Sequence, residues 1–370
     1  MILVCLDKFR GCLTAAEACS SVVAGVTAAG GDAVAMPVAD GGEGTLAALT
    51  GYRSVPVEVT GPTGRPVRAS FAVRGTRAVI EMAQASGLDL LPDLRTPLLT
   101  DTRGTGELIL AALDHGCLDI VLAVGGSATT DGGAGMLSAL GARVTDFRGT
   151  PIGPGGAALT SAAFVDLSSL DFRLRMAHVT LVSDVDNPLT GPDGAAEVFA
   201  PQKGASPRDV EVLERGLRQF ASVVARALGR DLSAAPGAGA AGGTGFAALA
   251  VLGAERVSGA EFVLSEIGVE NALRSASLVV VGEGRFDEQS LRGKAPVGVA
   301  ALARRLGVPI AVVAGDIRLS AAQLREVGAV ATWSLLERAG GLGAAIGQAP
   351  ELLVEIGREL AAVGAWGGAA

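Results

Sequence analysis

Histidine, cysteine and aromatic residues are scarce in this chain of 370 residues, which has 2 His, 4 Cys and 4% aromatic residues. No Cys-x-x-Cys pair occurs and no histidine lies at ligand spacing from a cysteine, so a zinc or iron–sulfur site has almost no ligands to draw on. Four cysteines are also too few for a disulfide framework, which predicts a reduced, cytoplasmic protein. The shortage of aromatics argues against stacking platforms for single-stranded nucleic acid.

Excess positive charge and long apolar runs are missing as well. The 30 Lys and Arg residues are outnumbered by 38 Asp and Glu residues, which gives a net charge of −8. Without a basic run the chain is a poor candidate for binding nucleic acid or an anionic membrane, because both require a cationic surface. No run of about 18 apolar residues occurs, so no membrane span is expected. The first residues also lack the basic region and apolar run of a signal peptide.

Short apolar runs alternate with Ala- and Leu-rich stretches of helical period. Several of the runs are apolar throughout, as strands covered on both faces are. The expected strands are 2–6, 33–38, 55–59, 78–82, 120–124, 178–182, 278–281 and 310–313, and the longer expected helices are 14–29, 105–115, 207–228, 259–276 and 295–306. This alternation predicts an α/β fold with largely parallel sheets. Residues 60–71 break it with a turn signal, and residues 234–245 predict a loop or linker.

Glycines and acidic residues recur directly after five of the expected strands. The segments are Asp40-Gly41-Gly42-Glu43-Gly44-Thr45, Gly125–Gly133, Ser183–Pro188, Gly282–Asp287 and Ala314-Gly315-Asp316. Ligands of open parallel sheets bind outside the carboxyl ends of the strands, so these loops are expected to share a cleft. Glycine lets the backbone approach phosphate oxygens, and carboxylates hold Mg²⁺ directly or through water. The pattern favours phosphoryl transfer, which needs positioning, charge neutralisation and one base.

Each of these loops also has a plain structural interpretation. Glycine-rich turns are common in α/β folds, Asp184 and Asp186 could form an Asx turn, and Ser127–Asp131 could cap a helix. No Walker A sequence is present, because Ala295 follows Gly293-Lys294 where Ser or Thr is required. Residues 243–248 fit Gly-x-Gly-x-x-Ala, yet no strand precedes them, so a dinucleotide-binding loop is disfavoured.

Few cations accompany the loops. They are Lys8 and Arg10 after the first expected strand, Lys203, and Arg285, Arg292 and Lys294 in or after the Gly282 loop. In an acidic protein, cations at strand ends are candidates to bind a substrate carboxylate or a transferring phosphoryl group. Neither histidine has a serine or cysteine signature nearby, so a Ser–His–Asp hydrolase is disfavoured.

Seven segments, taken in chain order, resemble the bacterial type-1 glycerate kinases along nearly the whole chain. They are Asp7–Gly11, Met36–Thr45, Gly125–Gly133, Asp184–Leu189, Ala200–Ala205, Gly282–Asp287 and Gly293–Pro296. The chain departs from the family pattern at Arg10, Thr130 and Phe199-Ala200, where the family often has Lys, Asn and Phe-Gly. The first departure keeps a cation but changes its geometry, and none removes a carboxylate.

This resemblance implies ATP-dependent, Mg²⁺-assisted phosphorylation of D-glycerate to 2-phosphoglycerate. It also implies two α/β domains with the active site in the cleft. The first would be a Rossmann-like parallel-sheet domain built from both chain ends, residues 1–64 plus 277–370, and the second an inserted domain, residues 65–276. The expected partners are D-glycerate and ATP, without nucleic acid or membrane, and a homodimer is left open.

The expected roles follow from the resemblance and from the chemistry of the loops. The expected catalytic residues are Lys8, Arg10, Asp131, Arg285 and Asp287, in which the cations bind the glycerate carboxylate or the phosphoryl oxygens and Asp287 or Asp131 is the base. The expected metal ligands are Asp184 and Asp186. Residues expected to bind substrate or ATP are Asp7, Asp40, Gly41, Gly42, Glu43, Gly125, Gly126, Ser127, Lys203, Gly282, Glu283, Gly284 and Lys294. The alternatives are a glycerate 3-kinase, a kinase of another short hydroxy acid, and a non-catalytic nucleotide or sugar-acid sensor.

Overall fold

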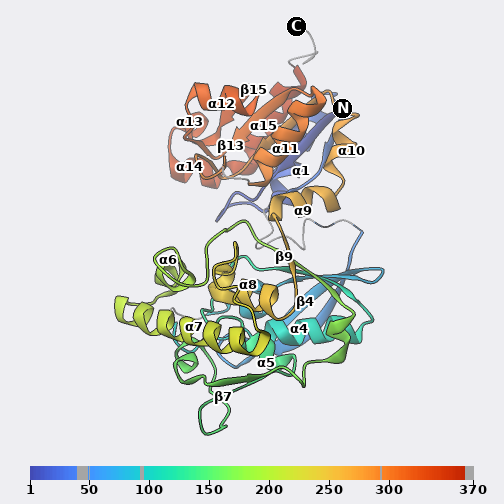
Figure 1. Cartoon of the computed structure of the whole chain (residues 1–370). Coiled ribbons are helices and arrows are strands. Elements are labelled where there is room, and N and C mark those ends of the chain that lie inside the picture. The colour runs from blue at the N-terminus through green and yellow to red at the C-terminus, as the bar shows by residue number, and fades with distance from the viewer. Residues whose placement is uncertain (40–48, 50, 92–95, 292–293, 363–370) are drawn as a thin grey trace. The chain divides into compact units, whose positions relative to one another are not determined.

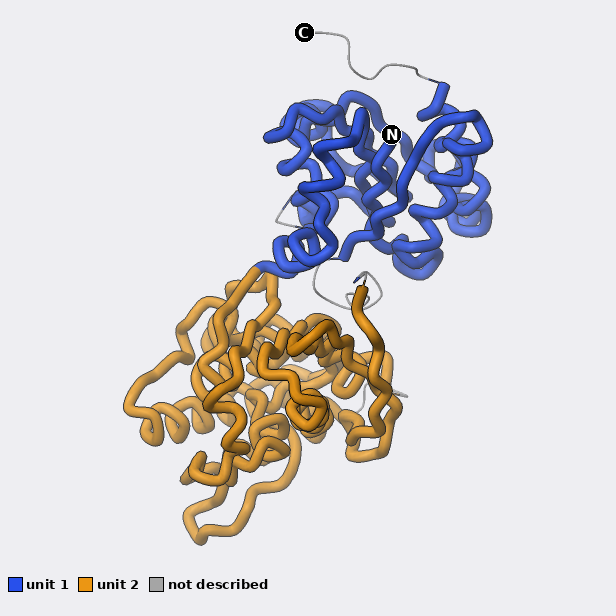
Figure 2. Tube along the Cα trace, turned by 90° about the vertical axis from the view of Figure 1, so that its right-hand side faces the viewer, with its two compact units in different colours: residues 1–40, 47–50, 258–370 blue, residues 41–46, 51–257 orange. Residues whose placement is uncertain are grey.

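The computed structural model describes residues 1–39, 49, 51–91, 96–291 and 294–362. The chain divides into two compact units, which Figure 2 colours separately. Among the described residues, unit 1 contains 1–39, 49 and 258–362, and unit 2 contains 51–91 and 96–257. The domain limits given above, 1–64 plus 277–370 and 65–276, stay a prediction.

A five-stranded parallel sheet forms the centre of unit 1. Its strands lie in the order β2 (Ala33–Ala35), β1 (Ile2–Leu6), β11 (Leu278–Gly282), β13 (Ile310–Ala314) and β15 (Ala329–Ser334). Strands β1, β11 and β13 are buried at every position, as their unbroken apolar sequences predict. The chain leaves β1 towards β2 on one side, and β11 lies on the other side, so a topological switch point lies between β1 and β11.

Two helices of unit 1 pack together through glycine. Helix α1 (Ala15–Ala28) begins with the capping box of Thr14 and Glu17 that the sequence predicts. It packs against α15 (Ala349–Ala362), as Figure 1 shows. A Cβ atom at Gly25 would overlap the carbonyl oxygen of Val354, so glycine is what lets the two backbones approach. The other helices of the unit are α9 (Gly259–Glu266), α10 (Val269–Leu273), α11 (Ala295–Leu306), α12 (Ala321–Val327), α13 (Leu335–Ala339) and α14 (Leu342–Gly347).

A six-stranded mixed sheet forms the centre of unit 2. Its order is β10 (Glu255–Val257), β9 (His178–Val182), β6 (Asp119–Ala123), β5 (Arg77–Glu81), β4 (Pro66–Arg74) and β3 (Arg53–Thr60). The first four strands are parallel, and β3 and β4 form an antiparallel hairpin around the turn at residues 61–64. The break in the alternation of strands and helices at residues 60–71 is therefore a hairpin.

The helices of unit 2 are α3 (Ala83–Ser86), α4 (Arg103–Asp114), α5 (Ala134–Ala139), α6 (Ala195–Phe199), α7 (Pro207–Leu228) and α8 (Ala240–Ala250). Short strand pairs are β7 (Arg143–Thr145) with β8 (Phe164–Asp166) here, and β12 (Arg285–Phe286) with β14 (Asp316–Ile317) in unit 1. None of the helices in the described ranges is long and apolar enough to cross a membrane.

The prediction of a loop or linker at residues 234–245 is wrong for residues 240–245. Residues 240–250 form α8, and most of them are buried. Ala241, Gly242 and Gly243 have positive φ angles of 52°, 65° and 93°, so the segment starts with a left-handed turn. A Cβ atom at Gly242 would overlap the carbonyl oxygen of Thr129. The glycines of this segment thus allow a close backbone contact in the core and do not form a flexible linker.

Candidate functional site

A cavity of about 720 Å³ lies in unit 1 beside the carboxyl ends of β1 and β11. The switch point between these strands is where open α/β sheets bind their ligands. The charged residues that line the cavity are Asp7, Lys8, Arg10, Glu283, Arg285, Asp287, Lys294, Asp316 and Arg318. Four of the expected catalytic residues therefore meet here, together with four of the expected binding residues, Gly284 among them. Gly282 ends β11 directly before them.

Glu283 is held by two donors in this cavity. Lys294 Nζ lies 2.6 Å from Glu283 Oε2, and Ser290 Oγ donates to Glu283 Oε1 over 2.6 Å. Ser290 is completely buried, and Glu283 is buried as well. Lys294 and Glu283, both expected to bind substrate or ATP, thus form a fixed ion pair on the cavity wall. Ser290 was not among the expected residues, although its place three residues after Asp287 is a turn signal.

Asp287 lines the cavity from a tight turn that binds one of its two carboxylate oxygens. Its Oδ1 accepts from the amide of Gln289 over 2.9 Å and from that of Ser290 over 3.4 Å. Its own amide donates to Ser290 Oγ over 3.1 Å. No described residue donates to Oδ2, so this oxygen can accept a proton or a hydrogen bond from a bound molecule.

Asp316 and Arg318 were missing from the expected site. They follow β13, and Arg318 Nε lies 2.6 Å from Asp316 Oδ2. The amide of Asp316 donates to the carbonyl oxygen of Gly284, which ties this loop to the one after β11. The sequence signal was present, because Ala314-Gly315-Asp316 repeats the pattern of glycine and acid after a strand.

Lys203 lies at the centre of a second constellation, in unit 2. It ends a short 3₁₀ helix (Pro201–Lys203) and is only 3% exposed. Its Nζ donates to Ser127 Oγ over 2.8 Å and to the carbonyl oxygen of Thr129 over 2.6 Å. Burial lowers the pKa of Lys203 to about 7, and the charge of Asp131 acts in the opposite direction. The buried amine of Lys203 therefore holds the loop after β6 through two hydrogen bonds.

The same loop contains an unsatisfied hydroxyl. Thr129 is completely buried, and its Oγ1 has no hydrogen-bond partner among the residues described. Gly125 and Gly126 precede it, and Gly126 has a left-handed φ of 72°. A buried hydroxyl without a partner is unfavourable unless a water or a ligand satisfies it. A loop with glycines, hydroxyls and a buried lysine suits the oxygen atoms of a phosphate group.

Asp131 is enclosed and its oxygens are occupied. The residue has no exposed surface, and its carboxylate accepts from the amide and hydroxyl of Thr102 and from the amides of Gly133 and Gly135, at 2.8–3.1 Å. Burial raises its pKa, and these hydrogen bonds act in the opposite direction. Asp131 therefore joins the start of α4 to the start of α5. Of the two expected bases, Asp287 is the one that lines the unit 1 cavity.

The expected metal ligands follow β9 and are both exposed. Asp186 Oδ1 lies 2.6 Å from an Nη atom of Arg256, so this carboxylate already has a cationic partner. Within the described ranges no group of three or more His, Cys, Asp or Glu residues is placed to hold a metal ion. Mg²⁺ needs no such cage, since it is commonly held by one or two carboxylates together with waters and phosphates. Asp184 and Asp186 fit that donor chemistry.

Four expected residues lie outside the described residues. They are Asp40, Gly41, Gly42 and Glu43.

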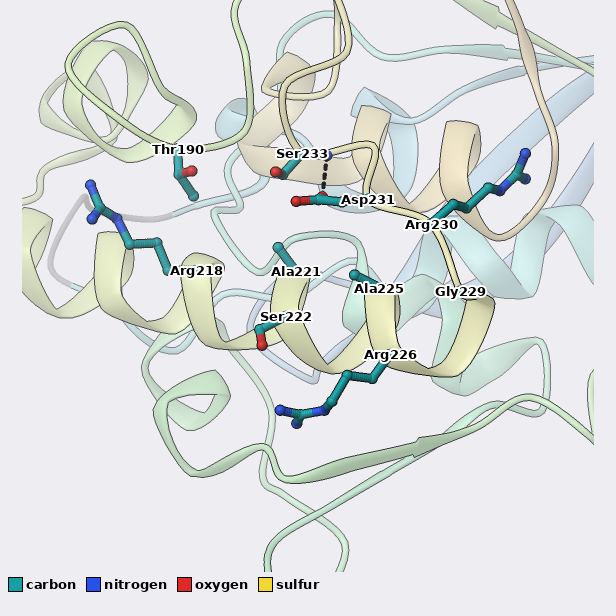
Figure 3. A pocket seen from close by; sticks show the side chains of 10 residues that line it. All are labelled: Thr190, Arg218, Ala221, Ser222, Ala225, Arg226, Gly229, Arg230, Asp231 and Ser233. Atoms are coloured by element: carbon teal, nitrogen blue, oxygen red, sulfur yellow. Dashed lines mark hydrogen bonds between the residues drawn. The ribbon is translucent and has the colours of Figure 1, made fainter.

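Another hollow, of about 610 Å³, runs along α7 and contains none of the expected residues. Figure 3 shows its lining side chains, in which Arg218, Arg226 and Arg230 point in different directions. Arg218 is also paired with Glu214 at 2.8 Å. Because the three guanidinium groups do not converge, this hollow is not the candidate site.

Comparisons with known proteins agree on one family. The model of the Glycerate kinase family matches residues 2–365. The chain is 45% identical over 369 residues to the glycerate kinase of Bacillus subtilis, covering 98% of this chain and 97% of that protein. It is 42% identical over 369 residues to the glycerate 2-kinase of Escherichia coli, with the same coverage of 98% and 97%. The crystal structure of the "putative glycerate kinase 2" from Salmonella typhimurium LT2 is 41% identical, with a TM-score of 0.85 over 98% of this chain and 97% of that one.

Proposed function

Because the chain belongs to the glycerate kinase family and is a kinase, we propose that it transfers the γ-phosphoryl group of ATP to the 2-hydroxyl of D-glycerate, assisted by Mg²⁺. The observation that carries this proposal is the convergence of Lys8, Arg10, Arg285 and Asp287 on one cavity at the switch point of unit 1. The 2-hydroxyl is the proposed acceptor because the Escherichia coli relative is named glycerate 2-kinase.

The three cations would bind the negative groups of the substrates. A guanidinium group can hold a carboxylate or a phosphoryl group through two parallel hydrogen bonds, which suits Arg10 and Arg285. The ammonium group of Lys8 acts as a point charge next to them. These residues would orient the carboxylate of D-glycerate and neutralise the charge on the transferring phosphoryl oxygens.

Asp287 is the proposed base. Its Oδ2 would accept the proton of the glycerate hydroxyl while the hydroxyl oxygen forms a bond to the γ-phosphorus. The bond from that phosphorus to the oxygen it shares with the β-phosphate breaks, and ADP leaves with the electron pair. The turn at Gln289 and Ser290 keeps Oδ1 occupied, so the carboxylate is already oriented before substrate arrives.

The glycine loops are proposed to bind the phosphate groups. Each unit has one such loop: in unit 1 it is the backbone of residues 282–284, which borders the cavity, and in unit 2 it is the backbone of residues 125–127, where Lys203 donates to Ser127. Asp184 and Asp186 would hold Mg²⁺. When bound, the metal ion neutralises phosphate charge.

Phosphorus-31 NMR of the reaction products tests the proposal. The chain with ATP, Mg²⁺ and D-glycerate should yield ADP and 2-phosphoglycerate. The 3-phosphate would favour the glycerate 3-kinase, and turnover only with another short hydroxy acid would change the substrate. Binding of nucleotide without any ADP release would leave the non-catalytic sensor.

A matched pair of variants tests the base. Asp287→Asn should lower kcat by about 10²-fold or more, because the amide cannot take the proton. Glu288→Gln, the exposed neighbour, should leave kcat unchanged. Near-normal turnover of Asp287→Asn would remove Asp287 from this role.

A further inference from the structure

The cavity of unit 1 has an apolar wall in addition to its charged residues. Helices α13 and α14, which lie side by side in Figure 1, and the first residue of α15 supply it. Its side chains are Leu335, Leu336, Leu342, Ala345, Ile346 and Ala349. Leu342 is 66% exposed and Ile346 is 48% exposed, so two large aliphatic groups face the cavity without a partner among the described residues that buries them. Exposed apolar surface beside polar groups commonly marks a binding groove.

The phosphoryl acceptor uses little of this space. Glycerate consists of three carbons and four oxygens, so it fills only the space of a few water molecules, at about 30 Å³ per water. The cavity measures about 720 Å³. Glycerate is also polar at every carbon, so the aliphatic side chains of α14 offer it no favourable contact. The apolar wall therefore suits a ligand other than glycerate, or the uncharged part of a larger ligand.

The charges of the same cavity indicate which ligand this is. Lys8 and Arg10 line it together with the apolar wall, so part of the lining suits phosphate groups and part suits an uncharged ring system. A nucleoside triphosphate combines these two chemistries in one molecule. The cavity also lies at the switch point, where nucleotides bind in sheets with the strand order of unit 1.

We propose that Leu342 and Ile346 bind the base and ribose of the phosphoryl donor, with its phosphates directed towards Lys8 and Arg10. This inference rests on the proposed function and adds the surface that recognises the nucleoside. The contact between α14 and the loop after β1 supports it, because Cys12 Sγ donates to the carbonyl oxygen of Ile346 over 3.3 Å. The apolar wall and the cationic residues are thereby held together.

Calorimetric binding of Mg·ATP and of magnesium tripolyphosphate to the full chain tests the proposal. The wild type should bind ATP at least about tenfold more tightly, because tripolyphosphate lacks the nucleoside. In the double variant Leu342→Asn/Ile346→Asn that difference should vanish, while the affinity for tripolyphosphate and the KM for glycerate stay unchanged. The apolar replacement Leu342→Met should keep the wild-type affinity for ATP.

Val330→Asn provides the matched control. Val330 is 59% exposed on β15 in the same unit and does not line the cavity, so this variant should bind both ligands as the wild type does. Unchanged ATP affinity in the double variant would overturn the proposal. So would a fall in Tm with equal losses of ATP and tripolyphosphate affinity, which would mean that the two side chains serve protein packing. Failure of the proposed function is a different result, namely that the wild type forms no phosphoglycerate.

Discussion

The ammonium group of Lys203 lies 2.6 Å from the carbonyl oxygen of Thr129. This contact joins a buried lysine to the backbone of a glycine-rich loop, and Ser127 Oγ takes a second N–H of the same group. A lysine in this position keeps the loop in one conformation, and below a pH of about 7 it also places a positive charge next to the loop. The arrangement makes both the shape and the charge of the loop depend on the protonation of one amine.

The stability of the chain should depend on pH through Lys203. The pKa of this lysine is about 7 in the folded chain and 10.5 in its ordinary state, so the unfolded chain binds more protons between these values. Its contribution to the free energy of unfolding therefore increases as the pH rises from about 7 to 10. Lys203→Met removes this increase. Urea unfolding of both proteins across that range measures it, and parallel curves would contradict the prediction.

Asp101 should show the opposite pH dependence. Burial, followed by the charge of Asp131, raises its pKa from 3.8 to about 6. The folded chain then binds more protons than the unfolded chain between these values, so the contribution of Asp101 to stability is lost as the pH rises through about 6. Relative to the wild type, Asp101→Asn should become more stable as the pH rises from about 4 to 6. Asp193→Asn, at an exposed carboxylate of the same unit, is the control in thermal unfolding.

Gly242→Ala should displace the loop after β6 that contains Thr129. The new Cβ atom would overlap the carbonyl oxygen of Thr129, and the φ of +65° is itself unfavourable for alanine. We expect a loss of about 2–4 kcal/mol in the free energy of unfolding. Gly229→Ala is a matched control, because its φ is +70° but nothing lies within 4 Å of the added atom. That variant should lose only about 1 kcal/mol. Equal losses would mean that the backbone angle alone matters.

Ser290→Ala should affect turnover more than folding. The buried hydroxyl donates to the carboxylate of Glu283 and accepts from the backbone amide of Asp287, so its removal loosens Glu283 and the turn that carries Asp287. We expect kcat to fall by about tenfold, with about 1–3 kcal/mol of lost stability. Steady-state kinetics and urea unfolding separate these effects, with the exposed Ser265→Ala as the control. An unchanged kcat would show that the turn holds Asp287 without this serine.

The family and the fold class could be predicted from the sequence, and both predictions are confirmed. Unbroken apolar runs such as Ile2–Leu6 and Ile310–Val313 predicted buried parallel strands, because a strand covered on both faces has no polar side. Helix 207–228 was predicted with its observed ends, which a capping box at Ser206 and a left-handed Gly229 fix. A cytoplasmic location and a homodimer stay predictions.

The roles within the site were harder to predict. Asp131 and Asp287 occur in similar glycine-rich sequences, yet one is enclosed by hydrogen-bond donors and the other lines a cavity. Only the packing of distant segments decides between these outcomes, since the donors to Asp131 include Thr102. The apolar wall at α14 was also missed, because Leu342 and Ile346 have the spacing of an ordinary amphipathic helix.

The position of β1 between β2 and β11 has a consequence for the newly made chain. Ile2 pairs with Ala33 on one side and with Leu278 on the other, so one edge of β1 waits for a partner that is made about 276 residues later. At about 5–20 residues per second, that delay lasts roughly 15–55 s. Unit 2 lies wholly within the intervening stretch and can fold during it. Throughout that time an entirely apolar strand is available to molecular chaperones, and translational pausing before β11 would prolong its exposure.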